Sequence, residues 1–390
     1  MAGIFCALAA LFFLIACHPF LTYPLSLRLL RLIRPRPLWR GSTGAAAAAP
    51  TFAVCVCAYN EASVIERTLR NLLAAREAMN GNLQILLYVD GATDGTAEIA
   101  RRYVDQIDLV LSLDNRGKNH GLNRLADRIR GDIVILIDAN VEIPVEAFAN
   151  LRTYFADPTV GCVCGHLTFV NAAETVTSMT GSFYWRLEER IKQLESDTGS
   201  VMGADGSLYA VRRECYQGIP SGAADDMYLS LAVLCDGYRV VRAGDVRAFE
   251  RTAADPREEF RRKVRIGCQG FSAHLALWPR LKSLDALDIY KYVSHKLFRW
   301  FTLLTLGLSA VFAFAALVVL AGFPAAVVIG VGSSALLWLG WRIGFPPFTL
   351  IVDILQSFAA TAIGVWRSLN GTLVGTWEPA GSVRKPEEIG

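Results

Sequence analysis

Two aspartates that directly follow apolar, β-rich stretches are the residues of this sequence best placed to do chemistry. Asp90 follows residues 86–89, and Asp138 follows residues 133–137. An open α/β sheet places ligand-binding groups at the carboxyl ends of its strands in this way. One carboxylate could hold a neutral polar part of a ligand. Asp138 together with Asn140 could hold a hard cation that carries phosphates.

A basic segment lies between the two aspartates in the sequence. Residues 116–121 read Arg-Gly-Lys-Asn-His-Gly, and we expect this loop, with Lys118, to face the phosphates. The set therefore predicts a nucleotide-diphosphate site. A dinucleotide oxidoreductase is set aside because the first strand is not followed by G-x-G-x-x-G.

A second acidic pair, Asp225 and Asp226, precedes a helical pattern over residues 227–234. One carboxylate within reach of a hydroxyl could take its proton as a general base. The alternative is that the two acids only cap the helix and favour its first turn.

Apolar periodicity predicts alternating strands and helices around these residues. The expected strands are 52–58, the run to Asp90, 109–111, the run to Asp138 and 160–170, and the expected helices are 62–73, 97–103, 121–129, 144–155, 182–195 and 257–275. Such β-α-β spacing implies a mostly parallel sheet with right-handed crossovers.

The composition adds membrane segments to this domain. Of 390 residues, 53% are hydrophobic and the mean hydropathy is +0.34, which is too apolar for an ordinary soluble enzyme. Residues 2–22, 301–322 and 324–341 are expected spans, and 345–365 is a weaker candidate because of Asp353 and Gln356. Five arginines over residues 28–40 predict that the following domain is cytosolic.

The chain is accordingly divided into six parts. They are an N-terminal transmembrane anchor (1–24), a basic and Ala-rich linker (25–50), a cytosolic nucleotide-sugar domain (51–256), basic amphipathic interfacial helices (257–298), a transmembrane region of two to three spans (299–368) and a polar tail (369–390). The nine cysteines contain no CxxC pair and are expected to be reduced core thiols. The net charge of +3 argues against nucleic acid or another acidic polymer as a partner.

An ordered set of motifs over roughly residues 50–275 resembles the membrane-bound family 2 glycosyltransferases, a group that includes poly-N-acetylglucosamine, cellulose and hyaluronan synthases. The motifs are Tyr59-Asn60-Glu61, Val89-Asp90-Gly91, Arg116-Gly117-Lys118 with Leu122-Asn123, Asp138-Ala139-Asn140, Gly203 to Gly206, Asp225-Asp226 and Arg262-Lys263-Val264-Arg265. The resemblance implies a GT-A fold, inversion at the anomeric carbon and Mg²⁺ or Mn²⁺ as cofactor.

The resemblance also implies a role for each motif residue. The implied donor-binding residues are Tyr59, Glu61, Asp90, Lys118, Asn123, Arg262 and Arg265, the metal ligands Asp138 and Asn140, the acceptor-binding residues Gly203 and Asp205, and the general base Asp226 with Asp225 as the alternative. Two plainer interpretations stay open. Glu61 could simply cap the helix that follows it, and Asp205 could have only a structural role in the turn that contains it.

Two departures from the family pattern matter. The metal-binding motif reads Asp-Ala-Asn, so Asn140 supplies an oxygen but no charge, and metal affinity should be lower. Ile266 stands where processive members of the family carry Trp, which weakens the case for polymerisation.

We therefore expect a multi-pass enzyme of the inner (cytoplasmic) membrane that moves a sugar from a UDP-sugar to a lipid-linked or polysaccharide acceptor. The alternatives are a processive polysaccharide synthase and a catalytically inactive subunit that binds nucleotide-sugar. An accessory synthase subunit is a further partner that the family allows.

Overall fold

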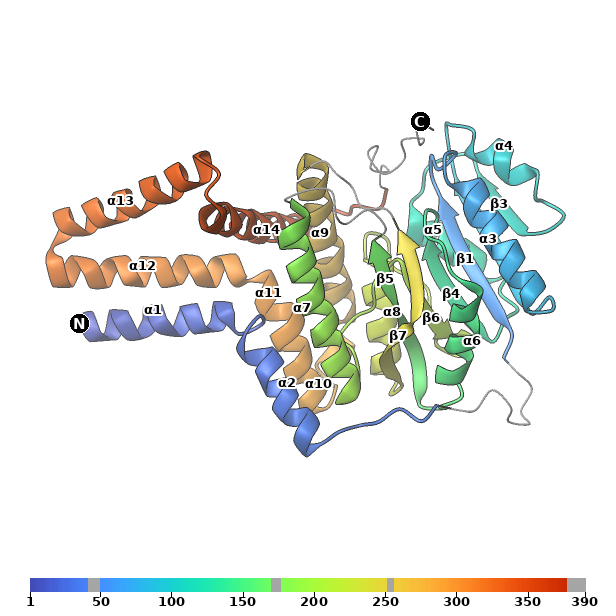
Figure 1. Ribbon diagram of the computed structural model, residues 1–390, viewed down its shortest axis with the longest axis horizontal. Helices are drawn as coiled ribbons and strands as arrows, with labels where there is room; N and C mark the ends of the chain where they lie inside the picture. Colours follow the sequence, from blue (N-terminus) through green and yellow to red (C-terminus); the bar gives the residue numbers. More distant parts are fainter. Residues whose placement is uncertain (41–49, 170–176, 251–255, 377–390) are drawn as a thin grey trace.

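The computed structural model describes residues 1–40, 50–169, 177–250 and 256–376, and its centre is a seven-stranded sheet (Figure 1). The strand order is β3-β2-β1-β4-β6-β5-β7. The strands are β1 (Phe52–Ala58), β2 (Leu83–Asp90), β3 (Asp108–Ser112), β4 (Ile133–Asp138), β5 (Val160–Phe169), β6 (Leu208–Arg212) and β7 (Arg239–Glu250). Only β6 runs antiparallel to its neighbours. The predicted α/β fold with a mostly parallel sheet is confirmed.

Helices cover both faces of this sheet. Successive side chains of β1 point to opposite faces, and both sets are apolar and buried. Val54 and Val56 pack into one apolar layer, while Cys55 and Cys57 pack into the other. A strand that is buried on both faces reads as a continuous apolar run, as this one does. The covering helices are α3 (Ile65–Ala78), α4 (Thr96–Arg101), α5 (Lys118–Ala126), α6 (Val145–Tyr154) and α8 (Asp225–Cys235), with a short 3-10 helix η1 (Arg213–Cys215).

The start of α5 corrects one expectation. Lys118 was expected in a loop before a helix over residues 121–129, but α5 begins at Lys118 itself. Gly117 precedes it with φ of +90°, a conformation that glycine adopts without strain. The loop is thus shorter than predicted, and Lys118 is held on a helical turn.

The N-terminal segment also differs from the prediction. The expected single span over residues 2–22 is a shorter helix α1 (Ala2–Cys17), followed by α2 (Thr22–Ile33) at a bend of 62°. The first part of the expected linker, residues 25–33, is therefore helical. Tyr23 and Leu27 of α2 are fully buried, where they pack on α7 (Thr177–Asp197), because α2 is amphipathic.

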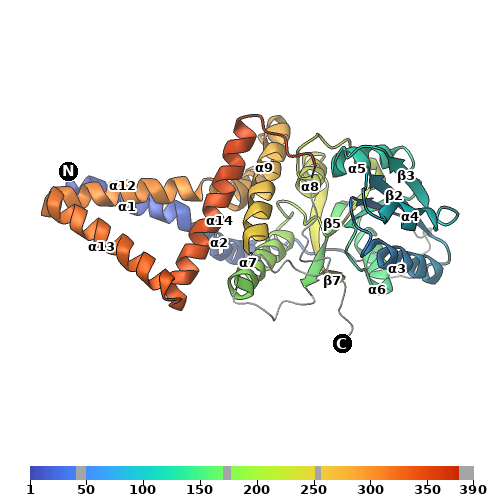
Figure 2. The same ribbon diagram turned by 90° about the horizontal axis from the view of Figure 1, so that it is seen from above.

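Three C-terminal helices within the described part of the chain are long and apolar enough to cross a membrane. They are α12 (Thr302–Ala321), α13 (Phe323–Arg342) and α14 (Pro346–Leu369), and the bent pair α1 and α2 would be a fourth span if counted as one. Helices α1 and α12 lie side by side in both views and extend away from the sheet (Figures 1 and 2). Phe12 stacks on Phe312 between them.

Helix α14 takes a different course and packs along α9 (Pro256–Leu281), as Figure 2 shows. Gly267 and Gly364 allow the two backbones to touch, since a Cβ on Gly364 would lie 2.4 Å from the carbonyl oxygen of Val264. Lys263 Nζ donates to Ser357 Oγ at 2.8 Å. Helix α9 therefore packs between α14 and α8, rather than lying alone on a surface. The remaining helices are α10 (Ala286–Tyr292), the π-helix η2 (Val293–Leu297) and α11 (Phe298–Trp300).

Candidate active site

Asp90, at the end of β2, holds the loop that precedes α5. Its carboxylate accepts hydrogen bonds from the backbone N–H groups of Arg116 at 2.8 Å and Gly117 at 2.7 Å. The side chain is almost fully buried. Asp90 thus fixes the backbone that carries Lys118, in addition to the donor-binding role that the sequence predicts for it.

Lys118 brings two of the predicted carboxylates together. Its ammonium group lies 2.8 Å from Asp138 Oδ1 and 3.1 Å from Asp225 Oδ2. Asp225 also accepts a hydrogen bond from the hydroxyl of Tyr209 at 2.8 Å. Burial alone would lower the pKa of Lys118, but the charges of Asp138 and Asp225 outweigh it and raise that pKa. Both partners of Asp225 restrain it, so it is poorly placed to act as a mobile base.

Asp226 is the less restrained carboxylate of the pair. Its carboxylate accepts a hydrogen bond from the backbone N–H of Met227, which lies 2.7 Å from Oδ1. Burial, followed by the charge of Asp225, raises the pKa of Asp226 to about 7, although Lys118 opposes this. A general base works best with a pKa near the working pH. Asp226 has that property.

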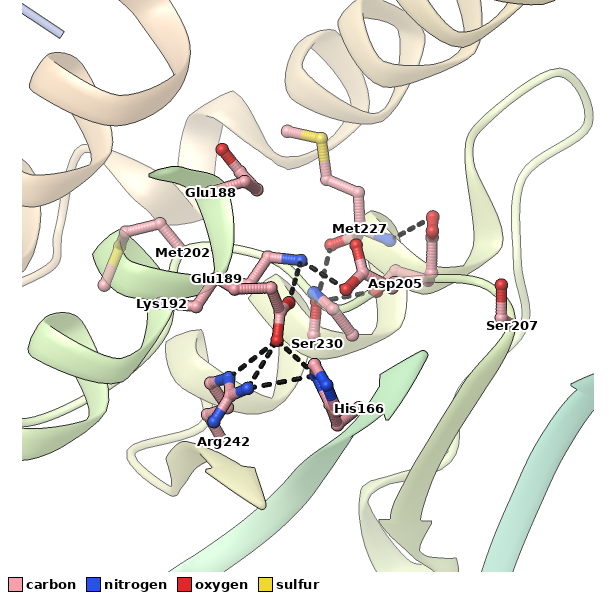
Figure 3. Close-up of polar contacts among 12 residues, drawn as sticks. His166, Glu188, Glu189, Lys192, Met202, Asp205, Ser207, Met227, Ser230 and Arg242 are labelled. Carbon is pink, nitrogen blue, oxygen red and sulfur yellow. Dashed lines mark hydrogen bonds and ion pairs between the residues drawn. The ribbon is translucent and has the colours of Figure 1, made fainter. Parts of the chain in front are cut away.

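The predicted acceptor residues lie on the turn beside Asp226. Gly203 has φ of +114°, and a Cβ on Gly206 would lie 3.2 Å from Asp226 Oδ2, so the turn passes close to this carboxylate. Asp205 forms an ion pair with the buried Lys192 of α7 (Figure 3). Because loss of Asp205 would remove the charge that pairs with the buried ammonium group of Lys192, Asp205 has at least a structural role here.

The ion pair between Lys192 and Asp205 is part of a larger buried network, which the sequence analysis missed. Glu189 lies 4.0 Å from Lys192 and accepts from Arg242 Nη2 at 2.5 Å and from His166 at 2.6 Å (Figure 3). This network connects α7 to β5 through His166 and to β7 through Arg242, next to the turn that contains Asp205. An amphipathic helix with charges on one face gives no sign that one of its lysines is buried.

The two predicted arginines of α9 approach the site to different extents. Arg265 is half-buried. Burial lowers the pKa of Arg265, and the nearby charge of Arg262 lowers it further, whereas the charges of Asp138 and Asp225 raise it. Arg262 is more exposed and lies 3.3 Å from Glu259 Oε2. Arg265 is therefore the arginine whose charge interacts with Asp138 and Asp225.

Two of the remaining predicted donor residues bond to nearby groups of the protein, and a third is half-buried. Asn123 uses both ends of its amide on the backbone of Ile219, each at 2.9 Å. Glu61 is fully buried, and its N–H donates to Thr96 Oγ1 at 2.8 Å, beside the start of α3. Tyr59 is half-buried. Their predicted contacts with a donor remain predictions.

The segment after α14 reaches the site from the far end of the chain. Val374 accepts from Gln269 Nε2 at 2.8 Å, and a Cβ on Gly117 would lie 2.0 Å from the carbonyl oxygen of Gly375. Residues 371–376 thus lie across the loop that Asp90 holds. Sequence pattern gave no signal for this contact between residues more than 250 positions apart.

A divalent cation fits the donor set at the end of β4. Carboxylate and amide oxygens, as on Asp138 and Asn140, are the hard ligands that Mg²⁺ and Mn²⁺ prefer. Asn140 Nδ2 donates to Glu250 Oε1 at 3.2 Å, and Glu250 at the end of β7 was not predicted. Its signal in the sequence is the same as that of Asp90 and Asp138, an acidic residue at the end of a strand.

Comparison with known proteins identifies several curated relatives of this chain. A relative described as N-acetylglucosaminyltransferase from Rhizobium meliloti (strain 1021) is 24% identical over 293 residues, which cover 70% of this chain and 67% of the relative. A poly-beta-1,6-N-acetyl-D-glucosamine synthase from Staphylococcus aureus (strain COL) is 25% identical over 189 residues, which cover 47% and 45%. The chain thus spans about half the length of several curated relatives that it matches.

A solved structure shares the fold over nearly the whole chain. The mannosyltransferase PcManGT from Pyrobaculum calidifontis, in complex with GDP-Man and Mn²⁺, superposes with a TM-score of 0.72 at 23% identity, covering 94% of this chain and 99% of that one. The family described as "Glycosyltransferase like family 2" matches residues 49–269, more than half of the sequence. The chain therefore belongs to the family 2 glycosyltransferases and has a GT-A fold.

Proposed function

We propose that this glycosyltransferase transfers a sugar from a UDP-sugar to a membrane-associated acceptor with inversion at the anomeric carbon. The observation that carries the proposal is Asp226, a half-buried carboxylate with a pKa of about 7, next to the ion pair of Lys118 with Asp225. Asp226 takes the proton of the acceptor hydroxyl. The acceptor oxygen bonds to the anomeric carbon, and the bond from that carbon to the diphosphate oxygen breaks.

Inversion is the outcome expected when Asp226 acts as a base and not as a nucleophile. A direct displacement needs only one carboxylate, on the face of the sugar opposite the leaving group. Asp225 is held by Lys118 and Tyr209 and does not offer a second reactive carboxylate. The two-carboxylate arrangement of retaining glycoside hydrolases is therefore not the pattern here.

The leaving diphosphate carries negative charge that the protein must stabilise. Lys118 on α5 and Arg265 on α9 supply fixed positive charges beside Asp138, and Arg262 adds a more exposed one. Asp138 and Asn140 would hold Mg²⁺ or Mn²⁺, which supplies Lewis-acid stabilisation of the diphosphate when bound. Asp90 supports the same region by fixing the backbone before Lys118.

The names of the relatives suggest which donors to test first. Several are described as N-acetylglucosaminyltransferases or poly-N-acetylglucosamine synthases, so UDP-N-acetylglucosamine is the first candidate. The structural relative was solved with GDP-Man, so GDP-mannose is the natural comparison.

The arrangement of the apolar helices supports a membrane position with α14 at the surface. Lys263 and Ser272 of α9 bond to Ser357 and Ser368 of α14, so α14 follows a polar helix of the catalytic domain. A lysine at mid-bilayer costs about 2.5–3.5 kcal/mol. We infer that α1, α12 and α13 span, and that the catalytic domain, α14 and residues 371–376 lie on the cytosolic side.

The alternative of a processive synthase finds less support in the site. Ile266 on α9 is 49% exposed and offers no aromatic face on which a sugar could stack. Three spans are also few for enclosing a polymer channel. An inactive binding subunit is disfavoured because Asp90, Asp138 and Asp226 are all present.

The experiment that tests the function is release of nucleoside diphosphate by the purified full chain in detergent or nanodiscs. UDP-N-acetylglucosamine, UDP-glucose and GDP-mannose would be compared, each with and without a membrane-lipid extract as acceptor source. We expect one donor to give UDP release that depends on added Mg²⁺ or Mn²⁺ and is lost in Asp138→Ala. Tight donor binding with no release for any donor and acceptor would favour the binding subunit.

A further inference from the structure

Two parts of the active site meet at the carboxylate of Glu250, the last residue of β7. Asn140 Nδ2 donates to Glu250 Oε1 at 3.2 Å, and Ser207 Oγ donates to Glu250 Oε2 at 3.1 Å. One oxygen of Glu250 is thus engaged by the cation motif and the other by the turn beside Asp226.

The bond to Glu250 decides which way the amide of Asn140 faces. An asparagine amide has a donor end and an acceptor end, and its orientation is set by the hydrogen bonds around it. Glu250 is an acceptor and therefore binds the Nδ2 end. Oδ1 is left as the end of the amide that can ligate a hard cation, whereas a flipped amide would present hydrogens to it.

Glu250 can also supply the negative charge that the Asp-Ala-Asn motif lacks. Asp138 and Asn140 together supply one negative charge, where two aspartates would supply two. Glu250 adds a carboxylate that accepts a hydrogen bond from Asn140 Nδ2. Within residues 1–40, 50–169, 177–250 and 256–376, no three His, Cys, Asp or Glu side chains are grouped as a metal site. Because Glu250 accepts from the amide of Asn140, it is placed behind a ligand in this proposal.

We propose that Glu250 is a positioning residue for the divalent cation. It turns the oxygen of Asn140 toward the cation, and its charge replaces the one that the motif lacks. The inference rests on the proposed cation dependence of the enzyme, because Asn140 acts as a ligand only if a cation is held there. Partners that orient a metal ligand affect metal affinity through that ligand.

The test is the dissociation constant of Mn²⁺, measured by electron paramagnetic resonance on the full chain with saturating UDP. Glu250→Gln keeps the shape and an acceptor oxygen but removes the charge, and should weaken Mn²⁺ binding by roughly 10- to 100-fold. The double variant Asn140→Asp with Glu250→Gln exchanges the donor and acceptor of the same hydrogen bond. It should restore the affinity to within a few-fold of the wild type, because it moves the charge onto the ligand.

A matched control is Glu142→Gln, two residues after Asn140 in the sequence. Glu142 is 42% exposed and pairs with Arg67 at 2.6 Å, so its charge is screened by solvent. Mn²⁺ affinity should be unchanged in this variant. Thermal unfolding of all variants identifies any loss of affinity that comes from a damaged fold.

Three outcomes would overturn the inference, and they are distinct. Unchanged Mn²⁺ affinity in Glu250→Gln would mean that Glu250 only ties Ser207 to β7. Weakened affinity that the double variant does not restore would mean that Glu250 acts on the cation directly, without Asn140. Absence of Mn²⁺ binding to the wild type would remove the cation from the proposed function as well.

Discussion

Lys118 Nζ lies 2.8 Å from Oδ1 of Asp138, the residue expected to bind the cation. Lys118 is on the first turn of α5, and Asp138 ends β4, so two elements that are separate in the sequence meet at this contact. The ammonium group and a divalent cation would be attracted to the same carboxylate. Each therefore weakens the binding of the other until phosphates arrive to share the positive charge.

This competition predicts how Mn²⁺ affinity responds to a nucleotide. The free protein should bind Mn²⁺ weakly, and UDP should strengthen binding because its phosphates pair with Lys118. Lys118→Met should bind Mn²⁺ more tightly than the wild type when no nucleotide is present, but should lose most of its affinity for UDP. Titration calorimetry measures both. Equal Mn²⁺ affinity for Lys118→Met and the wild type would show that the two cations do not compete, and Lys282→Met, at an exposed position, is the control.

The pKa of Asp226 predicts the pH dependence of transfer. A raised pKa means that the carboxyl is protonated, and cannot accept a proton, below about pH 7. The value of kcat/KM should therefore rise as pH increases through about 7 and level off above it. Initial rates at saturating cation measure this profile. A profile that is flat from about pH 5.5 to about pH 8.5 would mean that no group with this pKa limits the reaction.

The sequence predicted the part of the site that depends on strand ends. Asp90 and Asp138 each close a run of buried apolar residues, and parallel pairing of β1 with β2 and β4 brings both ends to one edge of the sheet. The apolar pattern of each strand and the parallel pairing of the strands both place the two aspartates at this edge, so their positions could be predicted without knowing any side-chain contact. Glu250 follows the same rule, but β7 was not recognised as a strand because its run is interrupted by Gly244 and Asp245.

Other parts of the site depend on contacts that pattern does not encode. Lys192 lies on an amphipathic helix whose charges look solvated, yet its side chain is 2% exposed. Gly375 meets Gly117 only because α14 folds back along α9. The bend between α1 and α2 was missed because an apolar run sets the length of a helix but not its direction.

The contacts of the C-terminal segment predict the membrane topology. Val374 bonds to Gln269 of the catalytic domain, so a reporter fused after Gly390 should lie on the same, cytosolic side. A reporter after Gly322, between α12 and α13, should lie on the opposite side, and one after Gly344 should again be cytosolic. Alkaline phosphatase and fluorescent protein fusions report the two sides. A C-terminal reporter on the outside would mean that α14 spans the membrane.

Ile266 is an exposed residue that offers no aromatic ring on which an acceptor sugar could stack, and this predicts a short product. One or a few sugars should be added to each acceptor, because the growing end has no stacking surface at this position to hold it while UDP leaves. Incubation with excess donor and limiting acceptor, followed by mass spectrometry of the product, measures chain length. Long chains beside untouched acceptor would show a processive enzyme and would point to other aromatic residues, such as Tyr184 or Trp185, as the platform.

The central claim is that Asp226 is the base of a transfer reaction, and the most direct test separates donor binding from turnover. Asp226→Asn keeps the shape and removes proton acceptance, so donor affinity should stay near the wild-type value while UDP release falls by about 10²- to 10⁴-fold. Asp236→Asn, at the other end of α8, is the matched control and should retain activity. Near-wild-type release by Asp226→Asn, together with loss of release in Asp225→Asn, would contradict the assignment.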